Sequence, residues 1–457
     1  MFFPGLICYD AWQIIAMFLE HPDLTFGYAN ITNIHPLVWA APIGELTKVA
    51  LHFDAPWLVP LFISTVQHVA AILLISYTVS SLKKMKLPPV FLAIVLAFYI
   101  LLPPMFVFSS VLQNDFLYSL SFQLMAVEFF HYLYDSHTYF KSIKHMFLTA
   151  LSVFGTILRY NGIYTVLVVL LCVLLREVCL ALKKKTKTSR IIALFLIIAI
   201  PLTGGQILQK TLDSVYDAIP MTTRIKYALP IQQSARCLAT YGTAIPEDIY
   251  NDLHTVLLWG DEELAEKYNP INYDGVKKCF KTDATNEEIR AFLSAWLKLV
   301  FMYPKDCIAA TANQTYFLFS PFADNTHYCI QSTLSANSIR ERYNFEINDY
   351  LFPGNQLLEA ERYMVLDILT KEYNAFPFIG LLDNQAIYTI LLFGIFFSLW
   401  FREDKRALLL SIAPLVTLGI TILGPTVYKH PRYTYPIMFC MPILIAAFAI
   451  GNKKNNK

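Results

Sequence analysis

Two aspartates occupy positions at which a carboxylate can act on a substrate. Asp10 follows a turn signal in PGLICYDAWQ, and we expect it at the start of an amphipathic helix, where the helix dipole favours a negative charge. Asp115, in VLQNDFLY, is expected at the mouth of a hairpin between two apolar helices. Two carboxylates at one face can position or deprotonate an acceptor hydroxyl, or hold a divalent cation such as Mg²⁺ or Mn²⁺. The alternative for each aspartate is a simple helix cap.

Basic side chains near the predicted helix ends are candidates for anion binding. They are Arg159 in LRYNG, Arg432 and its neighbour Lys429 in KHPRYTYP, and Arg236 in PIQQSAR. Arginine binds phosphate oxygens through two parallel hydrogen bonds, so the sequence predicts a site for an anionic lipid headgroup. The alternative is that these side chains lie along the membrane surface with their charges in water.

Polar side chains in the same motifs are candidates for positioning a substrate. His35 lies in NIHPLVW, Asn161 in LRYNG and Gln232 in PIQQSAR. Gln232, Gln233 and Arg236 fall on neighbouring turns of one predicted helix, so they are expected to face the membrane surface together. The alternatives are an ordinary His-Pro turn and a solvated polar helix face.

Two further polar residues lie inside apolar segments. Glu128 and His68 are each placed within a predicted membrane span, where an ionisable side chain is costly and usually functional. Glu128 is expected in the inner half of its span, far from Asp10 and Asp115. The role of His68 stays open.

The composition of the 457-residue chain indicates which elements must hold these residues. Apolar residues make up 56% and charged residues 15%, and the mean hydropathy is +0.46. Soluble proteins have about 45–50% apolar and about 25% charged residues. The composition excludes a disordered chain, a coiled coil, a nucleic-acid-binding protein and a conventional cytosolic enzyme. It predicts an all-α integral membrane protein that crosses the bilayer many times.

Apolar runs near the thickness of a bilayer core define the predicted spans. Nine are expected, at 57–80, 88–110, 114–133, 145–160, 162–182, 190–208, 386–401, 405–424 and 433–451. The run 36–53 is apolar on one side and carries Glu45, Lys48 and His52. It predicts an interfacial or re-entrant helix.

The distribution of lysine and arginine predicts the orientation of the chain. Seventeen of these residues lie in one set of short loops and at the C-terminus, and four lie in the opposite loops: Lys48, Arg159, Lys429 and Arg432. The first set is expected to be cytoplasmic, which places the C-terminus inside and residues 1–56 and 209–385 outside. Because the chain would then begin outside without a preceding anchor, we expect that a first span is missing upstream of Met1.

The predicted spans divide the chain into four parts. Residues 1–56 form a first outer loop with amphipathic helices, 57–208 hold about six spans, and 209–385 form a mostly helical extracytoplasmic domain. Residues 386–457 hold three more spans and a basic tail. Helices are expected at 285–304, with a cap at Thr285, and at 355–369.

The cysteines give little support for a metal site. The eight cysteines include no CxxC pair, which argues against zinc, and the partners of any disulfide stay open, Cys279–Cys329 being one option.

Seven short motifs, in order along almost the whole chain, resemble membrane glycosyltransferases of the GT-C superfamily. They are PGLICYDAWQ, NIHPLVW, QNDFLYSL, LRYNGIY, PIQQSAR, WLKLVFMYPKDCIAA and PRYTYPI. A bacterial group of uncharacterised multi-pass proteins within that superfamily is the most similar. The expected first span before the first outer loop is absent, and the 209–385 block lies between spans rather than after the last one.

The resemblance implies a GT-C-like helical bundle and a specific chemistry. Such families transfer a sugar from a polyprenyl phosphate or diphosphate donor to a glycan, lipid or protein acceptor outside the cytoplasm. Their essential outer-loop acid corresponds to Asp10, a second acid to Asp115, and their phosphate-binding residues to Arg159 and Arg432. The alternatives are a transporter or flippase of a lipid or polysaccharide precursor, and a non-catalytic membrane scaffold.

Overall fold

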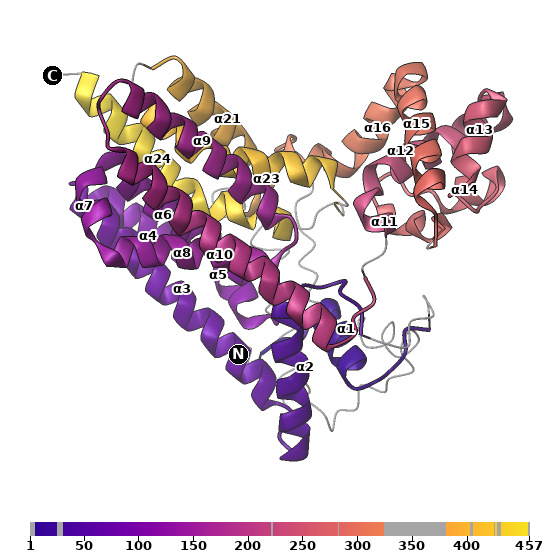
Figure 1. The fold of residues 1–457 in the computed structure, drawn as a ribbon, viewed down its shortest axis with the longest axis horizontal. Helices are drawn as coiled ribbons and strands as arrows, with labels where there is room; N and C mark the ends of the chain where they lie inside the picture. The colour runs from indigo at the N-terminus through magenta and orange to yellow at the C-terminus, as the bar shows by residue number, and fades with distance from the viewer. Residues whose placement is uncertain are drawn as a thin grey trace. The chain divides into compact units, whose positions relative to one another are not determined.

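The computed structural model describes residues 5–24, 31–220, 223–281, 283–323, 381–402, 405–424, 426 and 431–455. These residues form helices joined by short loops and contain isolated β-bridges but no β-strand. The chain divides into two compact units (Figure 1). The membrane unit comprises residues 1–220, 326–417 and 434–457, and the second unit comprises residues 221–325 and 418–433.

Among the described residues, four helical stretches are long and apolar enough to cross a membrane. They are α3 (Leu58–Lys84), α9 (Gly162–Leu182), α10 (Thr188–Val215) and the stretch Arg406–Leu423, which joins α22 (Arg406–Leu410) to α23 (Ile412–Leu423). The protein is therefore a helical membrane protein, as the composition predicts.

A bent pair of helices occupies the expected span 88–110. Helix α4 (Pro89–Leu101) and the stretch Pro103–Ser110, which combines α5 (Pro103–Val107) and η1 (Phe108–Ser110), meet at 57°. Pro103 and Pro104 cause the break, because proline disfavours a helical conformation in the preceding residue and lacks the N–H that would continue the ladder.

Shorter apolar helices fill three of the remaining expected spans. They are α8 (Ile143–Gly155) with η2 (Thr156–Leu158), α21 (Gln385–Trp400) and α24 (Tyr435–Asn455), which is apolar up to Ile450. With α6 (Asn114–Tyr134), a helix lies at each of the nine predicted segments. The short α7 (Ser136–Lys141) links α6 to α8.

Helix α6 lies at the centre of the membrane unit. It packs against α3, α8, α22 and α24, and 17 of its 21 residues are buried. Its polar side chains, including Asp115, Gln123 and Glu128, therefore face protein rather than lipid.

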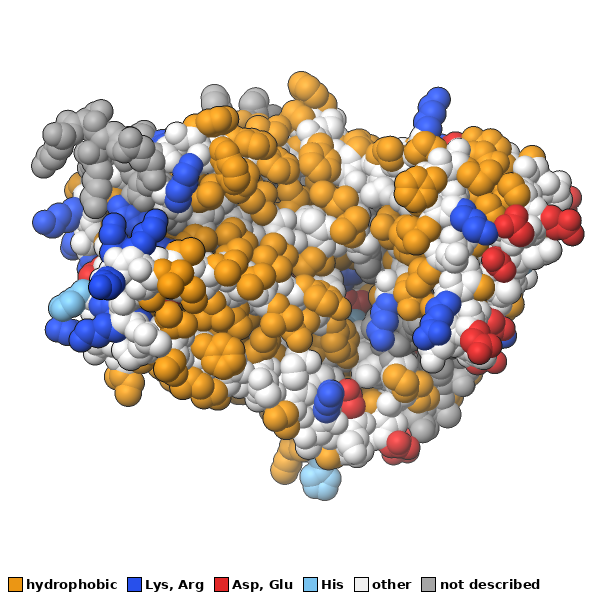
Figure 2. Space-filling model, turned by 45° about the horizontal axis from the view of Figure 1, so that its top comes forward, with side chains coloured by type: hydrophobic (Ala, Val, Ile, Leu, Met, Phe, Trp, Pro, Cys, Tyr) orange, Lys and Arg blue, Asp and Glu red, His pale blue; other side chains and the backbone are white. Residues whose placement is uncertain are grey.

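Exposed apolar side chains cover the outer helices of the membrane unit. On α3 they recur at helical spacing, at Phe62, Val66, Val69 and Leu73, and similar side chains are exposed on α4, α9 and α10. Figure 2 shows a broad hydrophobic surface with Lys and Arg gathered at one end. A soluble protein rarely exposes so extensive an apolar surface, which agrees with burial in lipid.

The two N-terminal helices differ in burial. Helix α1 (Tyr9–Phe18) is buried at every residue from Ala11 to Phe18, which corrects the expectation of an amphipathic surface helix. The sequence AWQIIAMF is apolar on almost all sides, and such helices are buried. Helix α2 (Leu37–His52) packs against α1 at Gly44, where an added Cβ would lie 2.0 Å from Cγ of Phe18.

The second unit is a small helical assembly around α12. Its helices are α11 (Thr223–Lys226), α12 (Ala228–Tyr241), η3 (Gly242–Ala244), α13 (Glu247–His254), α14 (Asp261–Lys267), η4 (Tyr273–Gly275), η5 (Lys277–Cys279), α15 (Asn286–Met302), α16 (Pro304–Thr315), η6 (Tyr316–Leu318) and η9 (Pro431–Tyr433). Helix α12 packs against α14, α15 and α16. The predicted cap at Thr285 is confirmed, because its side chain accepts from the N–H of Glu288. The predicted helix 355–369 lies outside the described residues.

Candidate functional site

An ion pair lies at the start of α6. Nε of Arg159 is 2.8 Å from Oδ1 of Asp115, and the two side chains are 20% and 3% exposed. The Arg159 guanidinium also lies over the ring of Tyr118, 5.7 Å from its centroid. The structure thus brings together two predicted site residues, which form an ion pair with each other.

The turn that carries Arg159 is held tightly against α6. The Asn114 side chain donates from Nδ2 to the carbonyl of Leu158 at 2.7 Å. Arg159 has extended backbone (φ −134°, ψ 137°) between η2 and α9. Gly162 closes the turn, because an added Cβ would lie 2.2 Å from the carbonyl oxygen of Thr156. The spacing of LRYNG is therefore explained by close packing as well as by the position of the guanidinium.

An extended segment brings the start of α1 to the start of α6. The N–H of Leu6 donates to Ser110 at 2.7 Å, and the N–H of Leu112 donates to Leu6 at 2.8 Å. The thiol of Cys8 donates to the Leu112 carbonyl at 3.1 Å. Because both paired segments lead directly into helices, two helix N-termini lie at the same end of the membrane unit. Each has an aspartate in its first turn, Asp10 in α1 and Asp115 in α6.

The NIHP motif lies beside the LRYNG motif. The Tyr160 hydroxyl donates to the carbonyl of Asn33 at 2.6 Å, and the N–H of Asn33 donates to Ile219 at 3.0 Å. His35 is half-buried two residues before α2, and Asn161 is half-buried directly before α9. Four motifs that are distant in sequence, at residues 5–10, 33–36, 110–115 and 159–162, are thus linked by hydrogen bonds and one ion pair.

His68, whose role the sequence left open, and polar residues that the sequence did not single out support the same end of the unit. Gln67 donates from Nε2 to the carbonyl of Gln113 at 3.3 Å. His68 has Nδ1 2.7 Å from the Ser64 carbonyl and Nε2 3.1 Å from the Ser109 hydroxyl. With Nδ1 as donor, Nε2 accepts from Ser109, so His68 fixes the segment that leads into α6. Its partners Ser64 and Ser109 belong to no recognisable sequence motif, so only the structure identifies them.

A second polar cluster surrounds Glu128 further along α6. Oε1 accepts from the Tyr77 hydroxyl at 2.6 Å, and Oε2 lies 2.8 Å from Nδ1 of His145. The rings of His131 and His145 are 4.5 Å apart. Thirteen residues separate Asp115 from Glu128, which is about 20 Å along a helix. The prediction that Glu128 lies far from the two aspartates is therefore correct.

The predicted residues of PIQQSAR lie in the second unit and have partners there. Nε of Arg236 is 3.3 Å from Oδ1 of Asp306. Gln232 is buried and donates to the Asn269 carbonyl at 2.8 Å, and Gln233 is buried beside α16. The expectation that these three side chains share a surface face is therefore corrected.

Of the two remaining basic candidates, the structure describes Arg432. Arg432 is in η9 of the second unit, with Nη2 3.4 Å from the Tyr433 hydroxyl. Lys429 lies outside the described residues.

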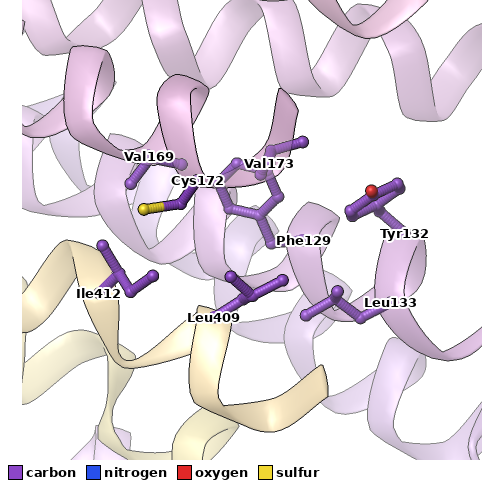
Figure 3. A pocket seen from close by; sticks show the side chains of 8 residues that line it. All are labelled: Phe129, Tyr132, Leu133, Val169, Cys172, Val173, Leu409 and Ile412. Atoms are coloured by element: carbon purple, nitrogen blue, oxygen red, sulfur yellow. The ribbon is translucent and has the colours of Figure 1, made fainter. Parts of the chain in front are cut away.

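No metal site emerges at the described residues. They contain no group of three His, Cys, Asp or Glu side chains placed to hold a metal ion. Asp115 bonds to a guanidinium, so this carboxylate does not fit a divalent cation in the observed arrangement. A small apolar cavity lies elsewhere, between α6, α9 and the α22–α23 stretch, lined by Phe129, Tyr132, Leu133, Val169, Cys172, Val173, Leu409 and Ile412 (Figure 3).

Comparison with known proteins gives a family but no described activity. No curated protein and no solved structure matches the chain. One family model matches residues 27–457, a range that includes Asp115, Arg159 and Arg432 and begins after Asp10. Because this match covers most of the sequence, the chain belongs to DUF6020, a family of unknown function.

Proposed function

We propose that the protein is a membrane glycosyltransferase that moves a sugar from a polyprenyl phosphate or diphosphate donor to an acceptor at the extracytoplasmic face. The observation that carries the proposal is the convergence of two aspartate-bearing helix N-termini and Arg159 at one end of the membrane unit. The resemblance of the motifs to GT-C enzymes supports the same chemistry. The loop charges support an extracytoplasmic position for this end.

The proposed roles follow from the environment of each side chain. Asp10 is half-buried in the first turn of α1 and would accept the proton of the acceptor hydroxyl as its oxygen attacks the anomeric carbon. The bond from that carbon to the donor phosphate breaks, and polyprenyl phosphate or diphosphate leaves with inversion. Arg159 would stabilise the charge on the leaving phosphate, because its guanidinium is a permanent cation that is one-fifth exposed.

Asp115 then acts as a positioning residue. Its carboxylate orients the guanidinium of Arg159, and the Tyr118 ring lies against that guanidinium. This assignment replaces the catalytic role expected from the sequence, because the Asp115 side chain is almost fully buried against Arg159. No step of the proposed reaction uses a metal ion.

The test is sugar transfer by the full chain in nanodiscs. Radiolabelled sugars on polyprenyl monophosphate and diphosphate are supplied with lipid, glycan and peptide acceptors, and both transfer and release of sugar are counted. Wild-type protein is compared with Arg159→Ala and with Lys48→Ala. Lys48 is the matched control because it is a basic residue on the same predicted side of the membrane, and it lies exposed on α2, paired with Glu45.

The expected result is turnover by wild type and Lys48→Ala, with a loss of about 100-fold or more in Arg159→Ala. If no donor gives turnover in any variant, the proposal fails. Equal turnover in Arg159→Ala and wild type would reject the site while leaving the reaction in place.

A transporter of a lipid-linked precursor is the second candidate function. Two observations favour it: the 57° bend between α4 and α5, and the Tyr77–Glu128–His145 cluster within the bundle. Transport of a fluorescent polyprenyl-linked sugar across liposome membranes that is abolished by Glu128→Gln, without sugar transfer, would select this function instead.

A further inference from the structure

Two cysteine sulfurs meet in the core of the second unit. Sγ of Cys237 on α12 lies 3.8 Å from Sγ of Cys307 on α16. The two residues are 0% and 1% exposed. Among the cysteines that the structure describes, this is the pair in sulfur–sulfur contact.

Contacts on both sides of the two sulfurs hold the helices in register. The ion pair between Arg236 and Asp306 lies one residue before each cysteine. One turn earlier on α12, Gln233 donates from Nε2 to the Cys307 carbonyl at 3.1 Å and to the Thr311 hydroxyl at 2.9 Å. The approach of the sulfurs is therefore fixed by the packing of α12 on α16. Closing the gap to a bond of about 2.05 Å requires small side-chain and helix adjustments.

The thiols also affect each other chemically. The hydrogen bond between them lowers the pKa of Cys307 and raises that of Cys237. A thiolate is the form that attacks a disulfide, so this contact favours exchange at Cys307.

The redox conditions of the compartment decide whether such a pair stays reduced or forms a disulfide. The loop charges place residues 209–385 outside the cytoplasm, where disulfides form and persist. This step rests on the orientation used in the proposed function. Cys329, which the sequence gives as one option for a partner of Cys279, lies outside the described residues, whereas Cys237 and Cys307 are already in contact.

We propose that Cys237 and Cys307 form a structural disulfide that clamps α12 to α16. The two thiols lose two protons and two electrons as the sulfur–sulfur bond forms. The disulfide of an extracytoplasmic thiol–disulfide oxidant accepts them and becomes a dithiol. The bond forms late in folding, when α12 has packed on α16 but the rest of the core has not yet closed over the thiols, and it joins positions 70 residues apart. Its loss lowers the midpoint of thermal unfolding of the second unit by roughly 10 °C.

The test traps the thiols of the full chain in membranes from a bacterium with an oxidising periplasm. Cells are quenched in acid, and thiols are alkylated under denaturing conditions before and after reduction, then located by peptide mass spectrometry. The expected result is that Cys237 and Cys307 react only after reduction and yield one cross-linked peptide pair. Cys237→Ser should free Cys307, and the matched control Cys279→Ser, buried in the same core, should leave the pair oxidised.

Free thiols at both positions in wild-type protein would overturn the proposal. Because the two thiols are buried in the folded unit, purified protein is then unfolded and refolded with oxidised glutathione to show which premise failed. Oxidation in vitro would mean that the unit lies in a reducing compartment, and no oxidation would mean that the helices do not allow the bond. Sugar transfer is a separate readout, so an intact disulfide without turnover rejects only the proposed function.

Discussion

The guanidinium of Arg159 bonds through Nε to Oδ1 of Asp115 at 2.8 Å, which joins the turn before α9 to the first turn of α6. The carboxylate is almost fully buried and the guanidinium is one-fifth exposed. A charged pair in this position has two roles. It stabilises the helix bundle, and it presents a cation at the end of the membrane unit where α1 and α6 begin. The two roles can be separated by experiment.

The first prediction concerns the strength of this pair. In a double-mutant cycle of Asp115→Asn and Arg159→Gln, we expect a coupling energy of about 1.5–3 kcal/mol, because each single change removes the opposite charge from a buried or half-buried ionised group. The measurement is SDS-induced unfolding in mixed micelles. The control cycle, Glu45→Gln with Lys48→Gln, concerns an exposed i,i+3 pair and should give about 0.5 kcal/mol or less. Equal coupling in both cycles would contradict the burial of the Asp115 pair.

The second prediction concerns the turn at Gly162. In Gly162→Ala the new Cβ would clash with the Thr156 carbonyl. We therefore expect the free energy of unfolding to fall by about 1–3 kcal/mol and sugar transfer to decrease. Gly204 on α10 is the control, since an added Cβ there meets no atom within 4 Å. Gly204→Ala should be neutral or stabilising by up to about 1 kcal/mol. Unfolding midpoints and turnover are measured together, and a wild-type result for Gly162→Ala would reject the close packing of this turn.

The third prediction concerns Glu128. Its carboxylate accepts a hydrogen bond from Tyr77 and lies beside His145. Glu128→Ala leaves these two polar side chains without that partner, and each loss should lower the free energy of unfolding by about 1–3 kcal/mol. Glu128→Gln keeps the shape of the side chain and one acceptor oxygen, so its free energy of unfolding should fall less than that of Glu128→Ala. Glu45→Ala, at an exposed carboxylate, should have little effect. Thermal unfolding that does not rank the variants in this order would argue against the cluster.

The fourth prediction concerns pH and the start of α15. A hydrogen bond from Lys281, at 2.6 Å, and one from the Thr285 N–H, at 2.8 Å, hold the pKa of Glu288 below its usual value. A depressed folded pKa gives stabilisation that is complete above the unfolded value, about 4.3, and is lost as pH falls through the folded value. Amide exchange, corrected for intrinsic rates, should therefore show α15 losing protection below about pH 4. Glu288→Gln should show no such acid-dependent loss, and parallel profiles for the two proteins would contradict the assignment.

Much of the fold follows from sequence because it depends on local composition. Apolar runs predicted helices at nine positions, and Thr285 followed by Glu288 predicted the start of α15. The burial of α1 could also have been inferred, since only Gln13 interrupts the apolar residues of AWQIIAMF. The Pro103-Pro104 pair signals the bend that the single predicted span 88–110 lacks.

The contacts of the site depend on long-range pairing and could not be read from spacing. Asp115 and Arg159 are 44 residues apart, and Leu6 pairs with Val111 across 105 residues. Nothing local to LRYNG indicates that its arginine bonds to a carboxylate, or that Arg236 bonds to Asp306. The polar type of Gln232 predicts a surface position, whereas the side chain is buried and its amide donates to the backbone carbonyl of Asn269.

The most direct test of the proposed function compares Asp10→Asn with Asp54→Asn in the nanodisc sugar-transfer assay. Asp54 is exposed after α2 with φ 51°, a backbone conformation that asparagine also adopts, so Asp54→Asn should retain full turnover. We expect Asp10→Asn to bind the polyprenyl-linked donor but to transfer sugar at least about 100-fold more slowly. Wild-type transfer by Asp10→Asn would contradict it.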